Sequence, residues 1–136
     1  MRGSLQSYRK VSLESEIAVA SPHRIIQMMF SGALERLAQA RFAIERNDIE
    51  NKGIFIGKAI GLINGLNNSL NMDEGGDIPV NLSRLYDFML IKLSEANINN
   101  DVKAIDDVSE ILRTIKEGWD AIPNDEHHMS SADSAN

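Results

Sequence analysis

Four stretches of this chain repeat apolar side chains every three or four residues, and short polar connections separate them. Because an α-helix has about 3.6 residues per turn, this spacing places the apolar side chains on one face of a helix. We expect helices over about 22–46, 49–70, 78–96 and 102–122. Short connections between long helices favour antiparallel neighbours, so the sequence predicts an all-α, antiparallel up-and-down four-helix bundle.

Residues with strong turn or cap preferences support these bounds. Ser21-Pro22 combines a capping residue with proline at the first helical position. Asn47-Asp48 and Gly75-Gly76 indicate turns, Asp101 can cap the fourth helix, and Pro123 ends it.

Each predicted helix has an apolar stripe that should face the core. In the first helix the stripe is Ile25, Met29, Ala33, Leu37, Ala40 and Ile44, with Ile26, Phe30 and Leu34 alongside. In the second it is Ile56, Ile60, Ile63, Leu66 and Leu70. In the third it is Leu82, Leu85, Met89, Leu93 and Ala96, flanked by Tyr86, and in the fourth Val102, Ile105, Val108, Leu112, Ile115, Trp119 and Ile122.

The two ends of the chain differ from this pattern. We expect an N-terminal arm over 1–20, the bundle over 21–122 and a tail over 123–136. The tail is polar and has no periodicity, so it is predicted to be disordered. The arm carries Leu5, Tyr8 and Val11, which could dock on a groove of the bundle.

Size and charge narrow the range of functions. The 136 residues suit one domain, and the net charge of −6 disfavours both nucleic acid and anionic membrane surfaces. No stretch approaches the roughly 20 apolar residues of a membrane helix, so no membrane insertion is expected. The absence of cysteine excludes disulfides and permits a reducing compartment such as the cytoplasm.

Catalytic and metal-binding patterns are missing. No histidine follows a glutamate by three residues, as di-iron bundles require, and there is no cysteine or Gly-x-Ser-x-Gly turn. We therefore expect no metal, no cofactor and no enzymatic activity. A phosphotransfer bundle remains an alternative, but it needs an exposed histidine in mid-helix, and His23 is expected to be an exposed residue of the first turn.

Gly53, Gly57, Gly61 and Gly65 recur every four residues along the second helix. Each costs about 1 kcal/mol of helix propensity relative to alanine, so a compensating interaction is expected. We predict that this glycine ridge packs closely against a neighbouring helix. The alternative is a shallow groove for a partner helix.

Several segments resemble one family. The run 25–33 is similar to the opening helix of flagellin-specific secretion chaperones, the FliS family, and 81–89 resembles the family's most recognisable stretch. Further matches are Tyr8, Ser21-Pro22, Lys58-Ala59, Ser69-Leu70, Gly75-Gly76, Ala96-Asn97, Asn100-Asp101 and Trp119. The departures are Ser31, where the family usually has an acid, Phe88 and Gly118.

This resemblance implies a cytoplasmic export chaperone. Such a protein binds the C-terminal segment of flagellin, blocks premature polymerisation and aids delivery to the flagellar type III export apparatus. A disordered, amphipathic client can fold as it lies on apolar grooves of a bundle. A purely structural bundle that forms a homodimer through its spare apolar surface is another alternative.

Most candidate flagellin-binding residues are apolar or aromatic positions beyond those that one inward stripe needs, and the arm adds one more; Met89 of the third stripe is included because methionine can supply adaptable contact. The candidates are Tyr8, Ile26, Met28, Phe30, Leu34, Tyr86, Phe88, Met89, Leu90 and Ile91. For each single position, ordinary core packing is the competing interpretation.

Overall fold

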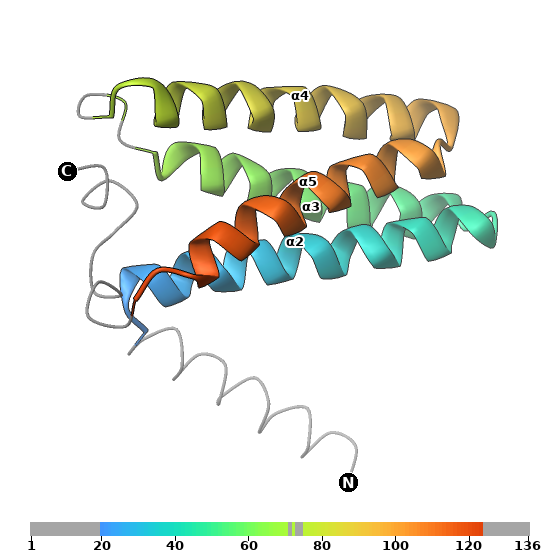
Figure 1. Cartoon of the computed structure of the whole chain (residues 1–136). Coiled ribbons are helices and arrows are strands. Elements are labelled where there is room, and N and C mark those ends of the chain that lie inside the picture. Colours follow the sequence, from blue (N-terminus) through green and yellow to red (C-terminus); the bar gives the residue numbers. More distant parts are fainter. Residues whose placement is uncertain (1–19, 71, 73–74, 124–136) are drawn as a thin grey trace, which may run out of the picture.

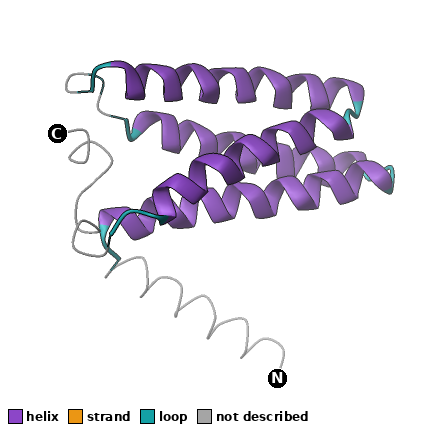
Figure 2. Cartoon of the chain, viewed as in Figure 1, coloured by secondary structure: helices purple, strands orange, loops and turns teal. Residues whose placement is uncertain are grey.

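The computed structural model describes residues 20–70, 72 and 75–123, and this part is built from helices and turns (Figures 1 and 2). The helices are α2 (Pro22–Glu45), α3 (Ile49–Asn68), α4 (Asp77–Asn99) and α5 (Val102–Asp120). The four predicted helices and the all-α class are thereby confirmed. The helix α4 continues to Asn99, past its predicted end at Ala96. The predicted arm and tail lie outside the described residues, apart from Ala20 and Pro123.

Local sequence fixes three of the four helix starts. The side chains of Ser21, Asp48 and Asp101 accept hydrogen bonds from main-chain N–H groups three residues ahead, at 3.1, 3.2 and 3.1 Å. These bonds satisfy donors that a helix start leaves unpaired. Two helices are followed by an asparagine in the left-handed region, Asn47 after α2 (φ 56°) and Asn100 after α4 (φ 55°). Asparagine tolerates this conformation better than most residues, so both turns are encoded locally.

Polar contacts between helices join the start of one helix to the end of another. Gln27 near the start of α2 donates to Asp120 at the end of α5 (2.8 Å), and Arg41 near the end of α2 pairs with Asp106 near the start of α5 (2.7 Å). This is the pattern of an antiparallel pair. Each helix packs against two others, in the order α2, α3, α4, α5 and back to α2.

A single core runs through the bundle, filled by side chains from all four helices. Its largest fully buried apolar members are Phe30, Leu37, Ile56, Ile63, Leu66, Met89, Leu93, Ile105, Val108 and Leu112. Two expectations about which side faces inward were wrong. Ile25 is 38% exposed and Leu85 39% exposed, whereas their neighbours Ile26 and Tyr86 are buried. The rest of each stripe faces inward as predicted, since Ala33, Leu37 and Ala40 of α2 and Met89, Leu93 and Ala96 of α4 are buried.

Lys52 is a buried cation that closes one end of the bundle. Its ammonium donates to the main-chain oxygen of Asn97 (2.8 Å) and to Oδ1 of Asn100 (2.6 Å). The last carbonyls of a helix have no partner within the helix and carry partial negative charge. Lys52 of α3 therefore supplies a hydrogen-bond donor to the acceptors at the end of α4 and links the two helices.

We expect Lys52→Met to lower the free energy of unfolding by about 1.5–3 kcal/mol, because hydrogen bonds from a charged donor are lost. Lys58→Met is the matched control, since Lys58 lies exposed on the same helix, and it should change stability by less than about 0.5 kcal/mol. Urea unfolding followed by circular dichroism measures both. A loss no larger at Lys52 than at Lys58 would contradict this role.

The glycine ridge on α3 does not pack against another helix along its length, contrary to the prediction. A Cβ added at Gly53, Gly57 or Gly61 would meet no atom within 4 Å, whereas one at Gly65 would run into the terminal methyl of Met29. Four residues advance an α-helix by about 400°, so each glycine is turned by roughly 40° from the last. The ridge therefore winds across the outer face of α3 and reaches α2 at Gly65.

Gly61→Ala should raise the free energy of unfolding by about 0.5–1 kcal/mol, because it gains helix propensity in open space. Gly65→Ala should gain less, since Met29 has to move. Thermal and urea melts of the two variants provide the comparison. A clear loss at Gly61 would mean that something covers this face.

Candidate binding cleft

A cleft opens at one end of the bundle, where the first turns of α4 face the last turns of α5. Helix α5 runs obliquely from the end of α4 towards the start of α2, so its C-terminal half diverges from α4 (Figure 1). The cleft has a volume of about 450 Å³. It is lined by Ile26, Phe30, Leu70, Gly75, Ile78, Pro79, Leu82, Tyr86, Thr114, Ile115, Gly118, Trp119 and Ile122.

The chemistry of this lining is almost entirely apolar. Among the described residues that form the wall, none carries a charge. The wall includes aliphatic side chains, three aromatic rings and two glycines, which leave room beside them. Such a surface gains free energy by covering the apolar side chains of a partner, and its described residues present no charged group to a phosphate or a metal ion.

The edge of the cleft is held by Trp119 and His23. The two rings stack with centroids 4.7 Å apart and an interplanar angle of 10°. Trp119 Nε1 donates a hydrogen bond to the main-chain oxygen of His23 (3.0 Å). His23 is 1% exposed, which corrects the expectation of an exposed first-turn residue. A phosphotransfer histidine must be reachable, so this burial disfavours that alternative.

A second contact at the same edge joins α2 and α5 through Asp120. Its carboxylate accepts from Gln27 Nε2 (2.8 Å) and from the ammonium of Lys116. Burial by itself would raise the pKa of Asp120, but the hydrogen bonds from Lys116 and Gln27 outweigh burial and lower it from its ordinary value. A carboxyl with a lowered pKa stabilises the folded state above the unfolded pKa, and this contribution is lost as the pH falls through the folded value.

Asp120→Asn should lower the free energy of unfolding at neutral pH by at most about 1 kcal/mol, because the site is partly exposed. The difference from the original chain should shrink as the pH falls below about 4. Asp107→Asn is the control for the loss of a carboxylate that does not join two helices, since Asp107 pairs with Lys103 within α5. Melting curves across this pH range test the prediction, and a difference that grows in acid would contradict it.

A shallower groove of about 520 Å³ continues from the cleft along α4 and α5. It shares Thr114 and Ile115 with the cleft and adds Leu85, Phe88, Lys92, Asp107, Glu110 and Ile111. Lys92 lies over the ring of Phe88, with its Nζ 5.7 Å from the ring centroid. The groove therefore has an apolar floor with charged groups of both signs beside it.

The predicted binding residues lie in several different environments of the structure. Ile26, Phe30 and Tyr86 line the cleft, and Phe88 lines the groove. Met89 is completely buried in the core, and Leu34 and Leu90 are partly buried and pack against that core. Ile91 is 60% exposed and lines neither hollow, and Met28 is half-buried on α2. Tyr8 lies outside the described residues.

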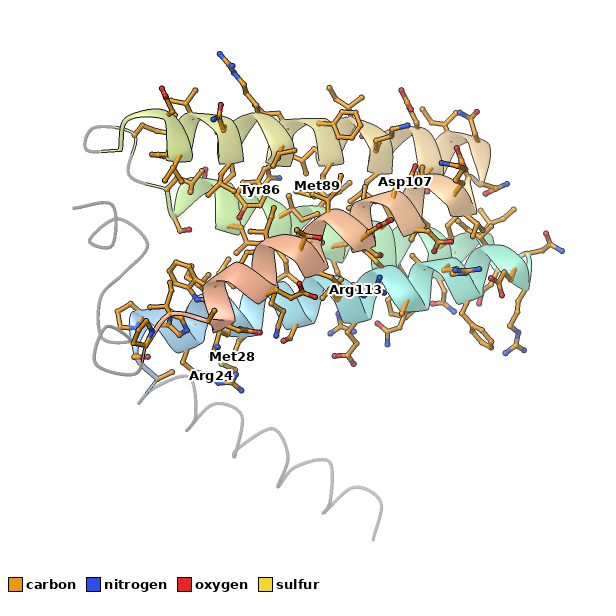
Figure 3. All side chains as sticks on the ribbon, viewed as in Figure 1. Arg24, Met28, Tyr86, Met89, Asp107 and Arg113 are labelled. Carbon is orange, nitrogen blue, oxygen red and sulfur yellow. The ribbon has the colours of Figure 1, made fainter. Side chains whose placement is uncertain are left out.

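Figure 3 agrees with this division: Tyr86 and Met89 lie on the side of α4 that faces the other helices, and Met28 points away from the other helices.

Sequence reasoning missed the helix-end members of the cleft, notably Ile78, Trp119 and Ile122. The signal was the presence of large apolar residues at the first turn of α4 and beyond the end of α5. The periodic apolar stripe alone does not distinguish residues of the core from apolar residues that line a cleft at the end of a helix.

Neither a membrane-spanning helix nor a metal site is found in the residues that the structure describes, 20–70, 72 and 75–123. No helix there has the length and hydropathy needed to cross a membrane. No group of three or more acidic or histidine side chains in the same ranges could hold a metal ion.

The fold is an all-α bundle with a cleft whose described lining residues are uncharged, and comparison with known proteins gives its family. The model of the flagellar protein FliS family matches residues 4–126. A flagellar secretion chaperone FliS of Vibrio cholerae is 48% identical over 133 residues, covering 98% of both chains. A flagellar secretion chaperone FliSB of Pseudomonas aeruginosa is 50% identical, covering 88% of this chain and 94% of its own. The chain belongs to the FliS family.

A solved bacterial flagellar chaperone has the same fold, with a TM-score of 0.68 at 17% identity over 86% of this chain and 94% of its own. Membership of a chaperone family confirms that the chain is not an enzyme. The family resemblance of the sequence is likewise confirmed.

Proposed function

We propose that this chain is a cytoplasmic export chaperone that binds the C-terminal segment of flagellin, prevents its premature polymerisation and aids its delivery to the flagellar type III secretion apparatus. Relatives named flagellar secretion chaperones support the export role. The observation that supports client binding is the uncharged apolar cleft between the start of α4 and the end of α5, which continues into a longer groove.

The physical basis is the burial of apolar client surface. An unfolded segment that carries apolar side chains at helical spacing can place them in the cleft and groove while it folds. While it is bound, the same side chains are unavailable for packing against other flagellin molecules. No nucleotide chemistry is needed, because release can follow from handover to the export machinery.

Tryptophan fluorescence can report binding at the cleft. The chain has one tryptophan, and this residue, Trp119, forms part of the cleft wall. A flagellin C-terminal segment without tryptophan should therefore change the fluorescence of the chaperone when it binds. Isothermal titration calorimetry gives the affinity independently.

Ile78→Glu should weaken binding of this segment at least tenfold, because a carboxylate placed at the cleft must be desolvated. Ile91→Glu is the matched control: both residues lie on α4, they are 73% and 60% exposed, and Ile91 is outside the cleft and the groove. Both variants should keep the original melting temperature within a few degrees.

Calorimetric titration decides between the outcomes. Equal affinities of the two variants would place the client elsewhere on the surface. If the original chain does not bind flagellin and only associates with itself, the structural homodimer becomes the better description.

A further inference from the structure

We propose that the hydroxyl of Tyr86 is the polar anchor of the cleft and donates a hydrogen bond to a neutral carbonyl oxygen of the bound flagellin segment. This inference rests on the proposed function. The Tyr86 hydroxyl sets the position of the client in an otherwise apolar site. The chemical group of the client that it contacts is a carbonyl.

The other polar side-chain atoms of the cleft wall are already engaged. Trp119 Nε1 donates to the main-chain oxygen of His23 (3.0 Å), and Thr114 Oγ1 donates to the main-chain oxygen of Glu110 (3.1 Å). Tyr86 is 3% exposed, yet its hydroxyl has no hydrogen-bond partner within the described part of the chain. The hydroxyl is not sealed off completely, so a partner can approach it from the cleft.

The state of this hydroxyl is set by its surroundings. Burial raises the pKa of Tyr86 to about 12, so the phenol is neutral at physiological pH and its proton is available for donation. A hydroxyl that loses water without gaining a partner costs about 1–3 kcal/mol. A client that covers the cleft with apolar groups alone would impose this cost, whereas a client that offers an acceptor would avoid it.

The acceptor must be uncharged. Because none of the described lining residues is a cation, a carboxylate in the cleft would be desolvated without compensation. A carbonyl oxygen is the neutral acceptor that every peptide carries. Within a helix most carbonyls are already bonded, so the oxygen at Tyr86 comes from the last turn of a client helix or from an extended residue beside it.

Tyr86→Phe tests the proposal, because it removes one oxygen and preserves the ring. We expect the tryptophan-free flagellin C-terminal segment to bind this variant about three- to tenfold more weakly. The melting temperature of the free variant should be unchanged or higher, since an unpartnered hydroxyl has been removed. A residue that merely supports the fold would show the opposite pattern.

Ser94→Ala is the control, because it removes a hydroxyl of α4 that already donates to the main-chain oxygen of Leu90 (3.1 Å) and lies outside the cleft and the groove. It should bind as the original chain does. The measurements use the segment both as a free acid and as a C-terminal amide, and the Tyr86 effect should be the same for both. An effect lost on amidation would identify a carboxylate and overturn the carbonyl assignment. Equal affinity of Tyr86→Phe and the original chain would overturn the anchor itself, whereas no binding by the original chain would overturn the proposed function.

Discussion

The attachment of the last turn of α5 to the first turn of α2 determines the shape of this molecule. Trp119 stacks on His23 and bonds its main-chain oxygen, and Asp120 accepts from Gln27 one residue further on. Both contacts draw the end of α5 towards α2. Among the described residues, no helix therefore packs directly against the start of α4 on that side, and the cleft occupies this position. The cleft is a consequence of where one helix ends.

The opposite end of the bundle is closed by charged groups. Lys52 bonds the end of α4, and Arg41 reaches from α2 to Asp106 on α5 with two hydrogen bonds of 2.7 and 2.8 Å. The two ends thus differ in chemistry: polar ties at one, and a mostly apolar hollow at the other. Phe42, Ile49 and Ile98 are exposed at or near the closed end, so it is the apolar cleft, rather than exposed apolar area alone, that distinguishes the open end for a partner.

Local signals made most of the fold predictable, and three-dimensional contacts explain what was missed. Helix starts at Ser21, Asp48 and Asp101 depend on side chains within three residues, so the sequence indicates them directly. The inward residue could not be fixed at one turn of α2 and one turn of α4: Ile25 and Ile26, for example, both fit a helical stripe, and packing selects one of them. The burial of His23 depends on Trp119, which is 96 residues away in the chain. Helix geometry alone predicts that the glycine ridge winds around α3, and the prediction from the sequence did not take this into account.

An apolar cleft on a small protein carries a risk of self-association, and the composition of the chain reduces it. The net charge of −6 makes encounters between copies repulsive, while the cleft itself contains no charge among its described residues. Repulsion acts over a Debye length, and burial of apolar surface acts on contact. A client with a lower negative charge than a second copy of the chaperone would therefore be favoured in the encounter. Apolar contact then supplies affinity, and because apolar surfaces can slide past one another, a directional hydrogen bond at Tyr86 would fix the register of the client.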